Sequence, residues 1–174
     1  MTLNLKIGDE NSESAGLLIS ILMRYPEIGA ISFNPDDHTM TLSFSCKKII
    51  TEKEFINKKN QLELCLDTYA YLEGKKSSVF AIQCLSTEEI SVLKIKHKVE
   101  SASKNEIALI INFLQQEFGD CLVRDLDRNE LLEEEDLLLQ DEFIGHMLES
   151  FKGKIPVNKI IAFREEGKVH LFKK

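Results

Sequence analysis

The chain has 174 residues, 43% of them hydrophobic and 29% charged, with a formal net charge of −7. This composition is typical of a globular protein, and the length allows one sizeable core or one domain with an appendage. No apolar run approaches the ~18 residues of a membrane-spanning helix, and an acidic chain is a poor general binder of nucleic acid. Residues 1–8 lack the pattern of a signal peptide, so we expect a cytoplasmic protein with no membrane partner.

The sequence of residues 1–85 predicts strands and helices in the order βαββαβ. Apolar and polar residues alternate over 2–7, which predicts a first strand. A polar loop is expected over 9–14, and apolar residues at helical spacing then predict a helix that Pro26 ends. The rest of the unit is predicted as strands over 29–34 and 40–46, a helix between a Thr51 cap and Gly74, and a strand over 78–85.

A fifth strand is predicted over 90–99, where apolar residues alternate with Lys94, Lys96 and Lys98. The preceding strand over 78–85 is apolar on both faces and is therefore unsuited to an exposed edge. We expect the fifth strand to form a hairpin with it and to become the edge itself, where lysines discourage pairing with other chains.

These elements predict a ferredoxin-like α+β fold, an antiparallel βαββαβ sheet extended by a fifth strand. We assign residues 1–100 to this domain and residues 101–174 to a helical region that packs on it and ends in a β-hairpin. The elements expected there are a helix from a Ser103 cap to Phe118, a helix over 129–151, a loop over 152–158 and a hairpin that turns at 165–167.

Charge is unevenly distributed along the chain. Residues 125–150 contain ten acidic residues and one arginine, and residues 151–174 contain seven basic residues and two acidic ones. We expect these adjacent segments, with net charges of −9 and +5, to fold back and screen each other. Basic groups paired in this way are unavailable to phosphate, so RNA binding is predicted to be weak.

The candidate binding surface combines two strands. The polar positions over 40–46 are rich in hydroxyl groups, and those over 90–99 form a lysine ladder with a spacing of roughly 6.6–7 Å, which suits a polyanion. Its residues are Thr41, Ser43, Ser45, Lys94, Lys96 and Lys98. The helix over 103–118 is apolar over so wide an arc that we expect it to cover part of the hydroxyl-rich face.

The sequence contains few features that indicate a catalytic site or a metal site. It contains no phosphate-binding loop, no nucleophile elbow and no HExxH motif, and no histidine has a visible partner for nucleophilic catalysis. Glu142, His146 and Glu149 share one helix face, which supplies at most an incomplete metal shell. The four cysteines are isolated, and we expect free thiols. We predict no catalytic residue, no metal and no cofactor.

One short stretch resembles a known family. Ala15-Gly16-Leu17-Leu18, followed by a helix and Ile28-Gly29-Ala30-Ile31-Ser32, is similar to the start of ACT ligand-binding domains, although Ala15 stands where the family has proline. The resemblance covers only this stretch. It implies a module that binds amino acids or similar small effectors at the first strand–helix loop, usually across a dimer, and it assigns no residue to that role.

The sequence therefore predicts a non-catalytic binding or regulatory module that acts through a protein partner or a small ligand, with a homodimer as one form. The alternative is an RNA- or ribosome-associated factor that uses the lysine-lined strand face, which the overall acidity disfavours. A third hypothesis is an enzyme whose residues carry no recognisable motif.

Overall fold

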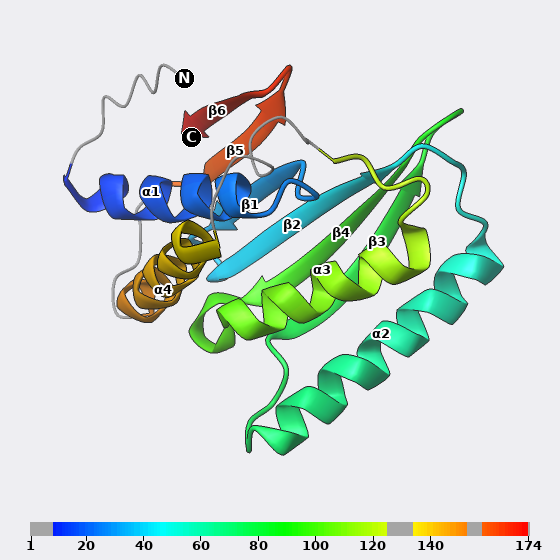
Figure 1. Cartoon of the computed structure of the whole chain (residues 1–174), viewed down its shortest axis with the longest axis horizontal. Coiled ribbons are helices and arrows are strands. Elements are labelled where there is room, and N and C mark those ends of the chain that lie inside the picture. The colour runs from blue at the N-terminus through cyan, green and yellow to red at the C-terminus, as the bar shows by residue number, and fades with distance from the viewer. Residues whose placement is uncertain (1–8, 125–133, 153–157, 174) are drawn as a thin grey trace.

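The computed structural model describes residues 9–124, 134–152 and 158–173 (Figure 1). The side chains of residues 9–12 and of Phe80 lie outside this description. The helices are α1 (Asp9–Arg24), α2 (Glu52–Leu72), α3 (Lys104–Phe118) and α4 (Glu134–Phe151), with a short 3₁₀ helix at Val99–Ser101. The strands are β1 (Ala30–Asn34), β2 (Thr39–Cys46), β3 (Val79–Ser86), β4 (Ser91–Lys98), β5 (Ile160–Glu165) and β6 (Lys168–Lys173).

The strands form one open antiparallel sheet in the order β3-β4-β2-β1-β5-β6. The α+β class is therefore confirmed. The ferredoxin-like topology is not, because that fold would place the strand predicted over 2–7 beside β2, and β4 occupies this position. Residues 2–7 themselves lie outside the described part of the chain. Strands from both sides of the predicted boundary at residue 100 contribute to the same sheet.

β4 lies in the interior of the sheet, which corrects the prediction that it forms an edge. The predicted hairpin with β3 is present, but β4 also pairs with β2 along its full length. β3 is therefore the edge strand on this side. A register shift between Val79 and Ala81 interrupts its ladder, and such irregularities discourage pairing with another chain. The lysines of β4 have no part in protecting an edge.

The helices lie together on one face of the sheet, and no helix of the described chain covers the other face (Figure 1). α1 contacts β1 and β5, α4 packs on α1, and α2 packs against α3. α1 begins at Asp9, so the loop predicted over 9–14 is wrong. Acidic residues in the first turns of a helix are stabilised by the positive end of its dipole, and Ser14 and Ala15 are already buried. None of the described helices is long and apolar enough to cross a membrane.

Both predicted helix caps are present. The Thr51 hydroxyl accepts a hydrogen bond from the Glu54 amide, and the Ser103 hydroxyl accepts one from the Glu106 amide, each at 3.2 Å. After α2, Gly74 adopts a φ of 70°, a conformation that glycine reaches without steric cost.

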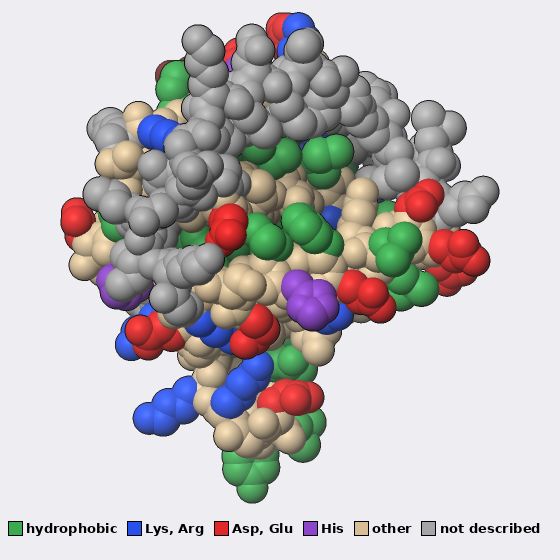
Figure 2. Space-filling view, turned by 90° about the vertical axis from the view of Figure 1, so that its left-hand side faces the viewer, with side chains coloured by type: hydrophobic (Ala, Val, Ile, Leu, Met, Phe, Trp, Pro, Cys, Tyr) green, Lys and Arg blue, Asp and Glu red, His purple; other side chains and the backbone are tan. Residues whose placement is uncertain are grey.

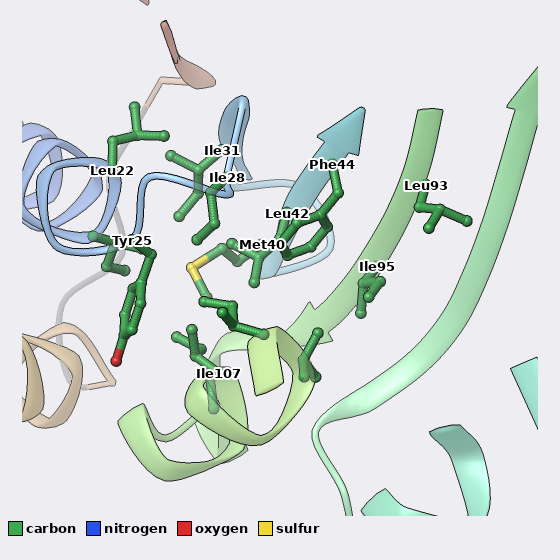
Figure 3. Close-up of a cluster of buried hydrophobic side chains, with 14 of the residues drawn as sticks. Leu22, Tyr25, Ile28, Ile31, Met40, Leu42, Phe44, Leu93, Ile95 and Ile107 are labelled. Carbon is green, nitrogen blue, oxygen red and sulfur yellow. The ribbon is translucent and has the colours of Figure 1, made fainter. Parts of the chain in front are cut away.

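One hydrophobic core lies between the helices and the covered face of the sheet (Figure 3). Met40, Leu42 and Phe44 of β2 are each at most 1% exposed, which confirms the alternation predicted for this strand. α3 joins the same core through Ile107 and Ile110. The prediction that α3 covers the hydroxyl-rich face is therefore wrong. Its wide apolar arc is buried because it packs against the apolar sheet face, α2 and α4 together.

The C-terminal hairpin is present as predicted and extends the sheet. A turn of Glu166 and Gly167, with φ of 50° and 75°, joins β5 to β6, and β5 pairs with β1. Positive φ at both turn positions matches the right-handed twist of the flanking strands.

α4 is the described part of the helix predicted over 129–151. Residues 125–133 lie outside the description, as does most of the loop predicted over 152–158. Arg24 of α1 contacts Asp141 of α4 through two nitrogen–oxygen pairs, at 2.9 Å and 3.3 Å. This paired contact fixes α4 on the side of the sheet that the other helices occupy.

Candidate binding surface on the open sheet face

The structure brings the six predicted surface residues together on the open face of β2 and β4. Residues that lie directly across a strand pair share one face of the sheet. The partners are Thr41 with Lys96 and Ser43 with Lys94, and Ser45 and Lys98 extend the two rows. All are half-buried except Lys98, which is exposed. The predicted residues therefore form one patch, which we call the lysine patch, because β4 pairs with β2 instead of forming the predicted edge.

Within residues 9–124, 134–152 and 158–173, the three lysines of the patch have no acidic ion-pair partner. No acidic side chain of the described chain forms an ion pair with them. α4, which carries six acidic residues, lies with the other helices on the opposite face of the sheet from the lysine patch (Figure 1). Among the basic residues after position 150, Lys152 pairs with Glu149, with 2.8 Å between Nζ and Oε1. The predicted screening by the acidic segment is thus present at Lys152 and does not extend to β4.

A groove of about 590 Å³ lies beside the lysine patch. Small residues of β1, β2 and the preceding turn form its floor, namely Gly29, Ala30, Ser43 and Ser45. Lys94 borders it on the β4 side, and the turn between β5 and β6 borders it on the other. This volume lies within the range of small-molecule binding sites.

Two arginines also border the groove, and each forms a polar contact with another residue. Arg164 donates hydrogen bonds through Nη2 to the carbonyl oxygens of Leu22, in the last turn of α1, and of Tyr25, the residue that follows the helix. Nε of Arg124 lies 3.5 Å from Oε1 of the buried Glu27. Lys94 is therefore the cation of the groove without an ion-pair partner in the described residues.

The open face also carries an aromatic cluster that the sequence prediction missed. Phe163 of β5 stacks against His170 and Phe172 of β6, with ring centroids 5.2 Å and 5.5 Å apart and interplanar angles of 20° and 2°. Phe163 lies across from Ala30, which in turn lies across from Ser43, so the rings share the face of the lysines. The alternation in the hairpin was visible in the sequence, but the face that it presents depends on pairing with β1.

A buried cluster of Ser78, His97 and Glu106 contains the side-chain types of a nucleophilic triad. Ser78 Oγ lies 3.0 Å from His97 Nδ1, and Glu106 Oε1 lies 3.6 Å from the same nitrogen. A working triad needs the nucleophile and the acid on opposite ring nitrogens. All three residues are also 0% exposed. His97 thus has partners that the sequence did not reveal, and their arrangement is structural.

An ionised Glu106 carboxylate joins the residues of this cluster. Burial raises the pKa of the Glu106 carboxyl, but hydrogen bonds from His97 and Ser78 outweigh it, so that the pKa is lowered overall. The Ser78 amide also donates to Glu106 at 3.2 Å. Glu106 therefore ties α3 to β4 and to the residue that precedes β3.

The cysteines offer no nucleophile in the core. All four are free thiols, and Cys46 is buried. Burial, together with the neighbouring Cys121, raises the pKa of Cys46 to about 12. The protonated thiol is a weak nucleophile and a weak metal ligand.

Glu142, His146 and Glu149 line a hollow of about 370 Å³ between α4 and the start of α3. Lys104 also borders this hollow. The described residues contain no group of three or more His, Cys, Asp or Glu side chains that could hold a metal ion. The shared helix face of these three residues is therefore not built into a metal site within that part of the chain.

α4 exposes apolar side chains among acidic ones. Leu138, Leu139 and Phe143 are 60%, 64% and 50% exposed. The helix also begins with three consecutive acidic residues, 134–136. Figure 2 shows hydrophobic and acidic side chains side by side on this side of the molecule.

Comparisons with models of protein families, with curated proteins and with solved structures find no match to this chain. They do not extend the short resemblance to ACT domains. The loop to which that resemblance points, before Ala15, is helical from Asp9 onward. The function must therefore be argued from the surfaces described above.

Proposed function

We propose that the protein is a non-catalytic binding module whose open sheet face binds a polyanion, with RNA as the partner that the predicted cytoplasmic location makes available. The observation that carries this proposal is the lysine patch: three ammonium groups on a sheet face that no described helix covers, with hydroxyl groups beside them and no acidic partner in the described residues. Lysines in this setting neutralise phosphates and release their counterions.

The overall charge of −7 does not by itself argue against this face, because six of the acidic residues lie on α4, although Glu27 and Glu166 line the groove beside Lys94. The acidic helix α4 is on the covered side of the sheet (Figure 1). Weak RNA binding was predicted because basic groups were expected to pair with that helix. Since the lysines of β4 do not, this reason for weak binding does not apply to them.

The test is a fluorescence-anisotropy titration of an oligouridylate of about 12 nucleotides, repeated at several salt concentrations. The variant Lys94→Ala/Lys96→Ala/Lys98→Ala should bind more weakly, and its slope of log affinity against log salt should be shallower by about 2. The matched control, Lys53→Ala/Lys59→Ala/Lys76→Ala, removes the same charge from α2 and the residues after it and should bind like the native chain. Equal effects of the two variants would contradict the proposal.

A second candidate function, contact with a protein, is favoured by α4. Its exposed Leu138, Leu139 and Phe143 lie on an acidic helix, which suits a partner segment with apolar and basic side chains. Calorimetric titration with a synthetic amphipathic Leu/Lys peptide tests this candidate. Binding should be lost in Leu138→Ser/Leu139→Ser/Phe143→Ser and kept in Ile56→Ser/Leu64→Ser, which changes exposed apolar residues of α2. Binding that neither variant reduces would rule out α4 as the contact.

A further inference from the structure

The aromatic cluster on β5 and β6 has the properties of a stacking surface. Phe163, His170 and Phe172 present three nearly parallel rings in one continuous group. Phe163 and His170 are half-buried, whereas Phe172 is 59% exposed. A planar ligand can therefore continue the stack on Phe172 without any change in the sheet.

The cluster lies at a defined distance from the lysine patch. One row across the sheet runs from Lys94 through Ser43 and Ala30 to Phe163 and His170. β4 and β5 are three strand spacings apart, which corresponds to roughly 14 Å. The side chains between them are small and form the floor of the groove. Lys94, Ser43 and Ala30 of this row line the groove, whereas the rings lie beyond it on the same open face.

We propose that the open face binds single-stranded nucleic acid, with bases stacked on Phe172 and its neighbours and phosphates directed toward Lys94 and Lys96. The inference rests on the proposed function and specifies the polyanion. A single strand offers unpaired bases and a charged backbone together, and both features of the open face match it. A duplex offers the same phosphates but keeps its bases paired inside the helix, and the rings would then have no ligand.

The first test compares ligands of equal backbone charge. An oligouridylate of about 12 nucleotides should bind the native chain roughly tenfold more tightly than an abasic oligonucleotide of the same length or a duplex RNA. Phe172→Leu, which keeps an apolar side chain but removes the ring, should abolish this preference. Phe143→Leu on α4 removes a ring of similar exposure from the covered side, and it should leave the preference unchanged.

The second test uses a reporter within the cluster. The chain contains no tryptophan, so Phe172→Trp introduces a single indole at the proposed stacking position. Its fluorescence should be quenched on addition of oligouridylate and not on addition of the abasic oligonucleotide. The same variant should retain the affinity of the native chain, because tryptophan provides a larger stacking face than phenylalanine.

The outcomes separate this inference from the proposed function. If the abasic and base-bearing oligonucleotides bind equally and the indole is not quenched, the stacking inference is overturned while polyanion binding stands. If neither oligonucleotide binds at low salt, or if the lysine-patch variant binds normally, both are overturned. Concentration-dependent dimerisation that Phe172→Leu abolishes, without any oligonucleotide, would show that a second copy of the chain covers the rings and would also overturn the inference.

Discussion

The two faces of this sheet are built from alternate residues of the same strands, yet they differ in what their side chains contact. On β4, Leu93 and Ile95 are at most 3% exposed against the helices, whereas Lys94 and Lys96 reach solvent from the opposite face. Packing accounts for the covered face, since each of its side chains fills space in one core. No helix of the described chain packs against the open face. Packing in a core therefore does not explain why lysines, hydroxyl groups and aromatic rings occupy it. The contrast predicts that stability depends on the covered face, and it supports the proposal that binding depends on the open face.

The largest difference between the faces is expected at two neighbouring residues of β2. Phe44→Ala should reduce the free energy of unfolding by about 3–5 kcal/mol, because the ring is fully buried and its loss leaves a cavity. Ser43→Ala, on the open face, should change it by less than about 0.5 kcal/mol. Denaturant melts of both variants measure these values. A cost above about 2 kcal/mol for Ser43→Ala would show that this face is covered in solution.

A smaller effect is expected from the buried polar cluster on the covered side. Glu106→Gln removes the charge that accepts hydrogen bonds from Ser78 and lies 3.6 Å from His97 Nδ1, which should cost about 2 kcal/mol in the free energy of unfolding. Glu117→Gln on the same helix breaks a partly exposed pair with Lys58 and should cost no more than about 1 kcal/mol. Similar losses in the two variants, measured by urea melts, would contradict the importance of the cluster.

The cluster of Ser78, His97 and Glu106 also predicts how the stability of the fold changes at acidic pH. Because the pKa of Glu106 is lowered in the folded chain, its stabilisation is complete above the ordinary pKa of glutamate, about 4.3, and is lost as the pH falls through the lower folded value. Glu106→Gln should therefore lose less stability than the native chain between neutral pH and about pH 3. If the two stability–pH curves ran parallel in this window, the ionised state assigned to Glu106 would be wrong.

The smallest effect concerns the contact between α1 and α4. Asp141→Asn weakens the half-buried pair with Arg24 and should cost about 1 kcal/mol. Burial, and secondarily the charge of Asp141, raises the pKa of Tyr25 to about 12, so the variant should lower that pKa toward its ordinary value. A spectrophotometric titration in a Tyr69→Phe/Tyr71→Phe background observes Tyr25 alone, because the other two tyrosines of the chain lie on α2. An unchanged titration would show that α4 does not hold Asp141 against Tyr25 in solution.

Local features of the fold could be predicted because they depend on near neighbours in sequence. The alternation over 40–46, the caps at Thr51 and Ser103 and the turn at Gly167 are of this kind. The position of β4 between β3 and β2 could not be predicted, because antiparallel pairing across a long sequence separation leaves no local signal. The early start of α1 was missed because polar residues suit a loop and the first turns of a helix equally well.

The residues of the candidate site also fall into two groups, those that strand alternation predicts and those whose position depends on strand pairing. Lys94, Lys96 and the hydroxyl residues of β2 were predicted as surface residues from strand alternation alone. Their juxtaposition was not predicted, because it follows from the pairing of β4 with β2, whereas the predicted order placed β4 at the edge beyond β3. Phe163 and Phe172 were visible in the hairpin, but nothing local indicates which face of β5 meets the helices. That assignment follows from the pairing of β5 with β1. A binding surface assembled across strands therefore becomes visible only when the sheet order is known.

The most direct test of the open face as a binding surface is ultraviolet crosslinking of an oligouridylate to the native chain, with the modified residues located by mass spectrometry. Crosslinks should fall on β4, β5 and β6, with Phe163, His170 and Phe172 among the modified residues, and should diminish as salt is added. Crosslinks concentrated on α2 or α4, or none at low salt, would contradict the assignment of binding to the open face.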